Sequence, residues 1–287
     1  MIRHAPSLGL GLGLSLRGYG AGGFSGLLDQ FPGAAAAYSL RSLSSRTTNV
    51  IRGRRISDNA EQDFTAAQIT DGTLAAFAGT GDCFLSAWFD QSGNGNDLTQ
   101  AVAVEQIKIV SAGVVLVSNG LPAVKGDGSS TSMVMDSTLS FAGEFDNFFV
   151  AESSAADWGA GLQRAPYGSS ANADYPRLNS SGWRYNINGS DSGTINYNPG
   201  SVPVDTQFVF NFNRDGSDVV EACIDGVVQT NTATLPGNSV ISKIMRRSLN
   251  TSQVWDGFIS EFIFYASDQS ANRAAIHGNI NEYYGTY

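Results

Sequence analysis

The segment 208–213 carries the clearest pattern in the chain, because large apolar and polar residues alternate there. Phe208, Phe210 and Phe212 fall on one face of an extended strand, and Asn211 and Asn213 fall on the other. This alternation is typical of an antiparallel strand with one buried face and one face toward solvent.

Short strands of this kind recur along the chain, with turn residues between them. Only 15% of the 287 residues are charged and 33 are Gly, a composition that favours sheets and turns over long solvated helices. The pattern predicts one all-β unit built as a two-sheet sandwich. The expected strands lie at 35–43, 50–56, 84–89, 114–117, 123–125, 133–135, 148–152, 208–213, 219–224, 227–230 and 258–265.

Two helices are expected beside the sheets. A short helix at 71–77 would have Thr70 as its N-cap and would stop before Gly79. A final helix would be capped by Ser267 or Ser270 and would continue to about residue 284, with Ile residues at helical spacing.

The first 33 residues differ from the rest, because nine of them are Gly and Leu alternates with Gly from position 8 to 14. An extended strand of this kind has one apolar face and no bulk on the other, so it cannot bury itself alone. We therefore predict an attachment and oligomerisation arm at 1–33 and a β-sandwich at 34–287, with a flexible linker as the alternative for the arm. The partner-binding residues of the arm would be Arg3, Leu8, Leu10, Leu12, Leu14, Leu16, Arg17, Tyr19 and Phe24.

The charge is distributed unevenly. Residues 1–55 hold seven Arg and one Asp, a net charge of +6. Residues 56–287 carry −15, so the whole chain has a net charge of −9. The net charge argues against nucleic acid as the main partner, and no apolar run reaches the length of a membrane helix. Arg52, Arg54 and Arg55 either belong to a basic docking segment or line one solvated edge strand.

Few residues are available for nucleophilic or metal chemistry. Cys83 and Cys223 could form one bridge, although two buried thiols are the default. His4 and His277 are the only histidines, and we expect His277 on the surface of the final helix. No zinc spacing and no cofactor motif is present, so we predict no cofactor.

The loop 90–97 is the most distinctive stretch. Its weak metal candidates are Asp90, Asn94 and Asp97, because oxygen side chains followed by Gly resemble the start of a calcium loop. Position 101, where an EF-hand needs Glu, is Ala101. We therefore favour a tight turn built by Asp, Asn and Gly.

Paired carboxylates would indicate a glycosidase. Glu144 and Asp146 form an E-x-D pair, and Glu221 and Glu261 lie in expected strands. Glu261 could be buried or face a cleft, either as an acid with a raised pKa or as a structural acid. The pattern assigns no catalytic residue.

Aromatic residues in the loop-rich middle of the chain offer a binding alternative. Trp158, Tyr175, Trp183 and Tyr185 would contact a glycan or partner if exposed, or would cover the core if buried.

The run 86–101, Ser-Ala-Trp-Phe-Asp-Gln-Ser-Gly-Asn-Gly-Asn-Asp-Leu-Thr-Gln-Ala, is similar to a segment of fungal arabinofuranosidase B catalytic domains. The resemblance implies a concanavalin A-like lectin/glucanase sandwich, a jelly roll, and 120–128 and 257–284 resemble the same group. The catalytic motifs of the family align with no position here, so the resemblance does not imply its activity.

The segment 41–63, with Arg-Gly-Arg-Arg at 52–55 and Ser-Asp-Asn-Ala-Glu-Gln-Asp at 57–63, resembles structural proteins of tailed bacteriophages. This resemblance implies a non-enzymatic virion protein, either a capsid decoration (cement) protein or a tail-fibre component. Its partners would be the major capsid protein or tail proteins, and it would form a homo-oligomer, with a trimer as one option. An arabinofuranosidase-like hydrolase and a carbohydrate-binding module are the alternatives.

Overall fold

The computed structural model describes residues 25–154, 165–169, 174–179, 182–188, 190–191, 204–247 and 253–287. Its helices are α1 (Leu27–Gln30), α2 (Ala66–Thr70), α3 (Thr73–Ala78) and α4 (Arg273–Tyr284), with a 3₁₀ turn at Ala103–Glu105. None of the helices in these residues is both long and apolar enough to cross a membrane.

The strands of the first half are β1 (Ala34–Ser39), β2 (Asn49–Arg55), β3 (Glu61–Thr65), β4 (Cys83–Trp88), β5 (Leu98–Thr99), β6 (Ile107–Ser111), β7 (Val114–Val115), β8 (Val117–Ser118), β9 (Leu121–Pro122), β10 (Val124–Asp127), β11 (Met133–Phe141) and β12 (Phe145–Ser153). Those of the second half are β13 (Tyr167–Gly168), β14 (Tyr175–Asn179), β15 (Gly182–Ile187), β16 (Ser190–Asp191), β17 (Gln207–Arg214), β18 (Val219–Ile224), β19 (Val227–Val228), β20 (Ala233–Thr234), β21 (Ser239–Ile244) and β22 (Asp256–Tyr265).

Strand β22 lies at the centre of the molecule. It pairs antiparallel with β1, β10 and β12, and β12 continues through β17 to β18. The main core contains stacked rings such as Phe149 on Phe210, whose centroids are 5.2 Å apart. The fold is therefore the predicted all-β sandwich. Strand β17 forms where the alternation at 208–213 predicts a strand, but both of its faces are buried, so the expected solvent-facing side with Asn211 and Asn213 is wrong.

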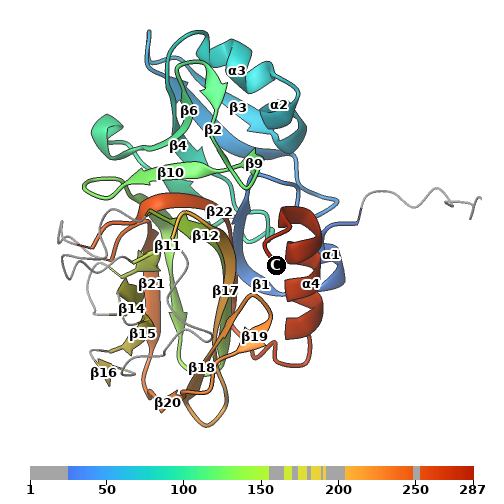
Figure 1. Cartoon of the computed structure of the whole chain (residues 1–287), viewed down its shortest axis with the longest axis vertical. Coiled ribbons are helices and arrows are strands. Elements are labelled where there is room, and N and C mark those ends of the chain that lie inside the picture. Colours follow the sequence, from blue (N-terminus) through green and yellow to red (C-terminus); the bar gives the residue numbers. More distant parts are fainter. Residues whose placement is uncertain are drawn as a thin grey trace, which may run out of the picture.

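A second, smaller core lies between the sheet and α4 (Figure 1). Phe148 and Ile263 of the sheet contact Ile276 and Ile280 of α4 in this core. Leu27 and Leu28 of α1 are buried in the same core. Thus residues 25–33, which we expected in the arm, are part of the folded body.

Two helix boundaries were predicted wrongly. The expected helix at 71–77 corresponds to α3, which begins after Gly72 (φ +94°) and not after Thr70. Helix α2 was not predicted; Thr65 caps it and Thr70 is its last residue. The final helix begins after Asn272, because Ser270 bonds to Asp268 instead of capping it.

The arginines of β2 do not line an edge strand, because β2 pairs with both β3 and β4. Arg52 pairs with Asp63, and Arg55 pairs with Asp58. Arg54 donates to Gln106 and Asn59. The sequence of β2 alone could not indicate these pairings, because the partner strands β3 and β4 are formed by later parts of the chain.

The two cysteines are buried and unbridged, as expected by default. Burial raises the pKa of both the Cys83 and the Cys223 thiol to about 12. The hairpin between β18 and β19 also follows the prediction, because Asp225 and Gly226 have φ values of 49° and 77°.

Candidate functional site

The loop after β4 is built around the carboxylate of Asp90. Its Oδ1 accepts hydrogen bonds from the backbone N–H groups of Ala37 (2.8 Å) and Ser92 (2.9 Å). Its Oδ2 accepts from the Ser92 hydroxyl (2.7 Å) and the Asn96 N–H (3.1 Å). Both oxygens of Asp90 are thus used by the loop itself and by β1.

Gln91 attaches this loop to the segment that follows β1. Its Nε2 donates to the carbonyls of Ser39 and Arg41, and its Oε1 accepts from the Leu43 N–H and the Thr47 hydroxyl. The side chain is buried, so its four bonds fix the chain between β1 and β2.

The metal candidates Asp90, Asn94 and Asp97 do not converge on one point. The Asn94 amide donates to the carbonyls of Ala34 and Ala35, an orientation that presents nitrogen and not oxygen to β1. Within the described residues no group of three His, Cys, Asp or Glu side chains could hold a metal ion. The loop is the turn that its composition favours.

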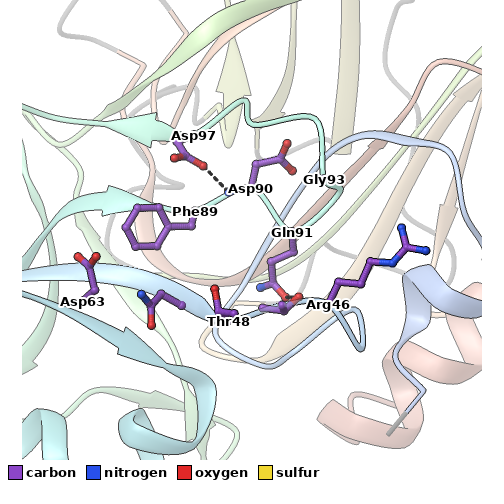
Figure 2. A pocket seen from close by; sticks show the side chains of 10 residues that line it. Arg46, Thr48, Asp63, Phe89, Asp90, Gln91, Gly93 and Asp97 are labelled. Carbon is purple, nitrogen blue, oxygen red and sulfur yellow. Dashed lines mark hydrogen bonds between the residues drawn. The ribbon is translucent and has the colours of Figure 1, made fainter. Parts of the chain in front are cut away.

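A pocket of about 360 Å³ opens between this loop, the start of β2 and the middle of β3 (Figure 2). The half-buried ring of Phe89 lies between Asp63 and Asp97. Asp97 Oδ1 accepts the Asp90 N–H at 2.8 Å, and burial raises the pKa of Asp97. The pocket is lined by Arg46, Thr47, Thr48, Asn49, Asp63, Phe89, Asp90, Gln91, Gly93 and Asp97.

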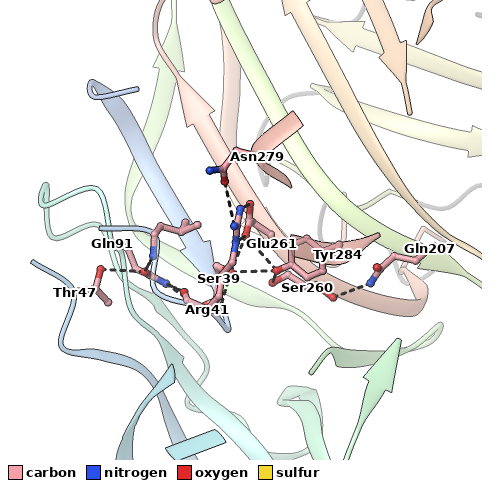
Figure 3. A network of polar contacts seen from close by, with 10 residues as sticks. Ser39, Arg41, Thr47, Gln91, Gln207, Ser260, Glu261, Asn279 and Tyr284 are labelled. Carbon is pink, nitrogen blue, oxygen red and sulfur yellow. Dashed lines mark hydrogen bonds and ion pairs between the residues drawn. The ribbon is translucent and has the colours of Figure 1, made fainter. Parts of the chain in front are cut away.

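Glu261, the candidate acid of β22, is buried in a separate network (Figure 3). Arg41 donates to both of its oxygens, Nε to Oε2 at 2.8 Å and Nη2 to Oε1 at 3.1 Å. The Ser39 and Tyr284 hydroxyls also bond to Oε2, at 2.8 and 3.2 Å. Glu261 is therefore a structural acid that joins β1, β22 and α4, and it does not face a cleft.

The other candidate acids are also held by the fold. Glu221 forms an ion pair with Arg273 of α4. Asp146 is fully buried and bonds to the Asn211 amide and, at 3.2 Å, to the Gln269 N–H. Burial raises the pKa of Asp146 to about 7. Glu144 is exposed, so the E-x-D pair does not form a two-carboxylate site.

His277 is buried, which corrects the expected surface position. It is on the inner face of α4, with its ring edge-on to Phe148 at 5.6 Å. Neither ring nitrogen has a hydrogen-bond partner among the described residues, and burial lowers the pKa of His277 to about 4. The helical spacing of the final segment alone does not show that the sheet covers the face of α4 that carries His277.

Two of the four aromatic candidates are core residues. Trp183 and Tyr185 of β15 are fully buried, with ring centroids 4.0 Å from Phe210 and 4.7 Å from Phe212. They cannot contact a glycan from these positions. Tyr175 is in β14, and Trp158 lies outside the described residues.

The nine arm residues, Arg3 to Phe24, also lie outside the described residues, so their contacts stay a prediction. Sequence reasoning missed Phe89, Asn49 and Arg41. Phe89 had a local signal, because it is an aromatic residue directly before a polar turn. Arg41 had none, since its partner Glu261 is 220 positions away.

The strands and the core define a β-sandwich with a small polar pocket beside the 90–97 loop. No family model and no curated protein matches this chain. Among solved structures, a mutant of a GH54 α-L-arabinofuranosidase soaked with 4-nitrophenyl α-L-arabinofuranoside is similar, with a TM-score of 0.65 and 16% identity over 86% of this chain. An arabinofuranosidase complexed with arabinofuranosyl-α-1,2-xylobiose has a TM-score of 0.57 at 16% identity. This chain spans 62% of the length of each, and the likeness concerns the fold.

Proposed function

We propose that this chain is a non-enzymatic structural protein of a tailed-phage virion, either a capsid decoration protein or a tail-fibre component. Its N-terminal segment docks on other virion proteins or on copies of itself, and the sandwich is displayed outward. The resemblance of 41–63 to phage structural proteins and the Gly-rich start support this proposal.

The observation that carries the non-enzymatic part is the state of the candidate acids. A glycosidase needs two carboxyl groups that face each other across the scissile bond and are free to exchange protons or attack. Of the four candidate acids, Glu261 is held by Arg41 and Glu221 by Arg273. Glu144 is exposed, but Asp146, the other member of its E-x-D pair, is sealed beneath α4, so the pair does not face a substrate together.

The docking part rests on where the folded body begins. Leu27 and Leu28 are buried in the second core, so the body needs the chain from α1 onward. Residues 1–24 add two arginines, five alternating leucines and no acid. Such a segment is suited to an apolar groove on an acidic neighbour, and the residues after position 55 carry a net charge of −15.

Truncation separates docking from folding. A chain lacking residues 1–24 should unfold at the same temperature as the full chain and fail to enter particles. A chain lacking residues 1–30 is the matched control. It should lose stability, because it loses the buried Leu27 and Leu28, and the loss of one buried Leu side chain costs about 2–5 kcal/mol. Unchanged incorporation of the first truncation would overturn the docking proposal.

Arabinofuranosidase-like hydrolysis is the competing function, and the likeness to GH54 structures favours it at the level of the fold. We expect no turnover of arabinofuranosyl substrates. Turnover that disappears in Glu221→Gln, which changes a partly exposed acid and leaves the Arg41–Glu261 network intact, would replace our proposal by this one.

A further inference from the structure

The pocket beside Phe89 differs from the acid networks in having polar groups without partners. The Asn49 amide and the Thr48 hydroxyl make no hydrogen bond with the described residues. Asp97 uses Oδ1 for the Asp90 N–H, and its Oδ2 has no partner within the described ranges. One acceptor and two groups that can donate or accept therefore meet around one cavity.

Phe89 supplies an apolar surface among these groups. Its ring is half-buried, and the guanidinium carbon of Arg52 lies 5.7 Å from its centroid. The backbone N–H of Phe89 donates to the Val50 carbonyl at 2.9 Å, so the ring is carried on a fixed backbone. A fixed ring with polar groups around it can pack against the C–H face of a sugar while its hydroxyls find partners.

Charge decides between a neutral and an acidic ligand. Asp63, Asp90 and Asp97 all line the pocket, and Asp63 is neutralised by Arg52. Arg46 lies at the opposite end from Phe89, and its guanidinium points away from the ring (Figure 2). The guanidinium of Arg52, which lies over the Phe89 ring, is already paired with Asp63. An acidic sugar stacked on Phe89 would therefore lie beside Asp97, with Arg46 at the far end of the pocket.

We infer that this pocket is a binding site for a neutral saccharide, one ring of which stacks on Phe89 and bonds to Asp97, Asn49 and Thr48. The cavity of about 360 Å³ falls within the size range of small-ligand sites, ~300–1,000 Å³. The residues that carry this inference all lie between positions 46 and 97, so saccharide binding and particle incorporation can be tested independently.

Saturation-transfer NMR on the full chain tests this inference. The probes are the methyl glycosides of glucose, galactose, mannose and arabinofuranose, with N-acetylneuraminic acid as an acidic probe. We expect at least one neutral glycoside to bind and Phe89→Ala to weaken that binding at least tenfold. Asn49→Ala and Asp97→Asn should also weaken it, which keeps the test valid if Phe89→Ala fails to fold.

Phe84→Ala is the matched control. Phe84 is another half-buried ring, in the strand β4 that leads to Phe89, with the Arg54 guanidinium 5.5 Å from its centroid, but it lies outside the pocket. This variant should bind like the full chain. Absence of binding for all neutral probes, binding of the acidic probe alone, or equal loss in Phe84→Ala and Phe89→Ala would each overturn the inference.

Discussion

The Arg41–Glu261 network and the Phe89 pocket both place carboxylates beside the segment between β1 and β2, yet they differ in how those groups are used. Every oxygen of Glu261 is bonded to a side chain of the fold. In the pocket, one carboxylate oxygen of Asp97 has no hydrogen-bond partner within the residues described, and neither do the side chains of Asn49 and Thr48. We infer from this difference that a carboxylate whose oxygens are all hydrogen-bonded stabilises the structure, whereas a carboxylate with a free oxygen is available to a ligand.

Breaking the saturated network should have the largest effect. Glu261→Ala leaves the Arg41 guanidinium almost buried and without its counterion, which costs about 3–5 kcal/mol. The measurement is the free energy of unfolding in urea. Asp63→Ala, which breaks the more exposed pair with Arg52, is the matched control and should cost about 0–1 kcal/mol. Similar losses in the two variants would remove the distinction between the regions.

The groups beneath α4 should make stability depend on pH in two opposite ways. The pKa of His277 is lowered to about 4 from its usual 6.5, so its stability contribution is present above pH 6.5 and is lost as the pH falls through 4. The loss should approach about 3 kcal/mol. His277→Gln should flatten this acid limb in urea melts from pH 4 to 7, and an unchanged limb would contradict the assignment.

Asp146 should produce the opposite limb. Its pKa is raised to about 7 from 3.8, so its contribution is complete below pH 3.8 and is lost as the pH rises through 7. Asp146→Asn keeps the shape and removes the titration, so the variant should gain stability relative to the parent between pH 5 and 8. A constant difference between the two proteins across this range would exclude Asp146 as the titrating group.

Substitutions in the pocket should change the free energy of unfolding least. Thr48→Ala and Asn49→Ala remove no side-chain hydrogen bond with the described residues, and Thr48 is exposed, so each should change the free energy of unfolding by no more than about 0.5 kcal/mol. Thermal melts of the two variants check this. A loss comparable with that of Glu261→Ala would mean that these side chains support the structure and do not serve a ligand.

Much of the sandwich could be predicted because a strand carries its pattern locally. The alternation at Phe208–Phe212 and the Asp225-Gly226 turn were sufficient for β17 and the β18–β19 hairpin. Burial could not be predicted where the covering residues are distant. The sequence around Trp183 and His277 does not show that Phe210 and Phe148 cover them in the fold.

The site was only half predictable for the same reason. The Asp90–Asp97 loop could be predicted as a turn, because Asp90 and Asp97 bond to nearby backbone groups and Gly93 and Gly95 have positive φ. The pocket also needs Asn49 and Asp63, which reach the loop only through the pairing of β2 with β3 and β4. No local pattern contains that pairing.

The central proposal is that residues 1–24 find their partner outside their own subunit. An electron cryomicroscopy reconstruction of the particle that carries this chain tests it most directly. We predict density for the alternating leucines at 8–16 against a neighbouring chain, with the sandwich on the outside. Density that places this segment wholly against its own sandwich, touching no other chain, would contradict the account.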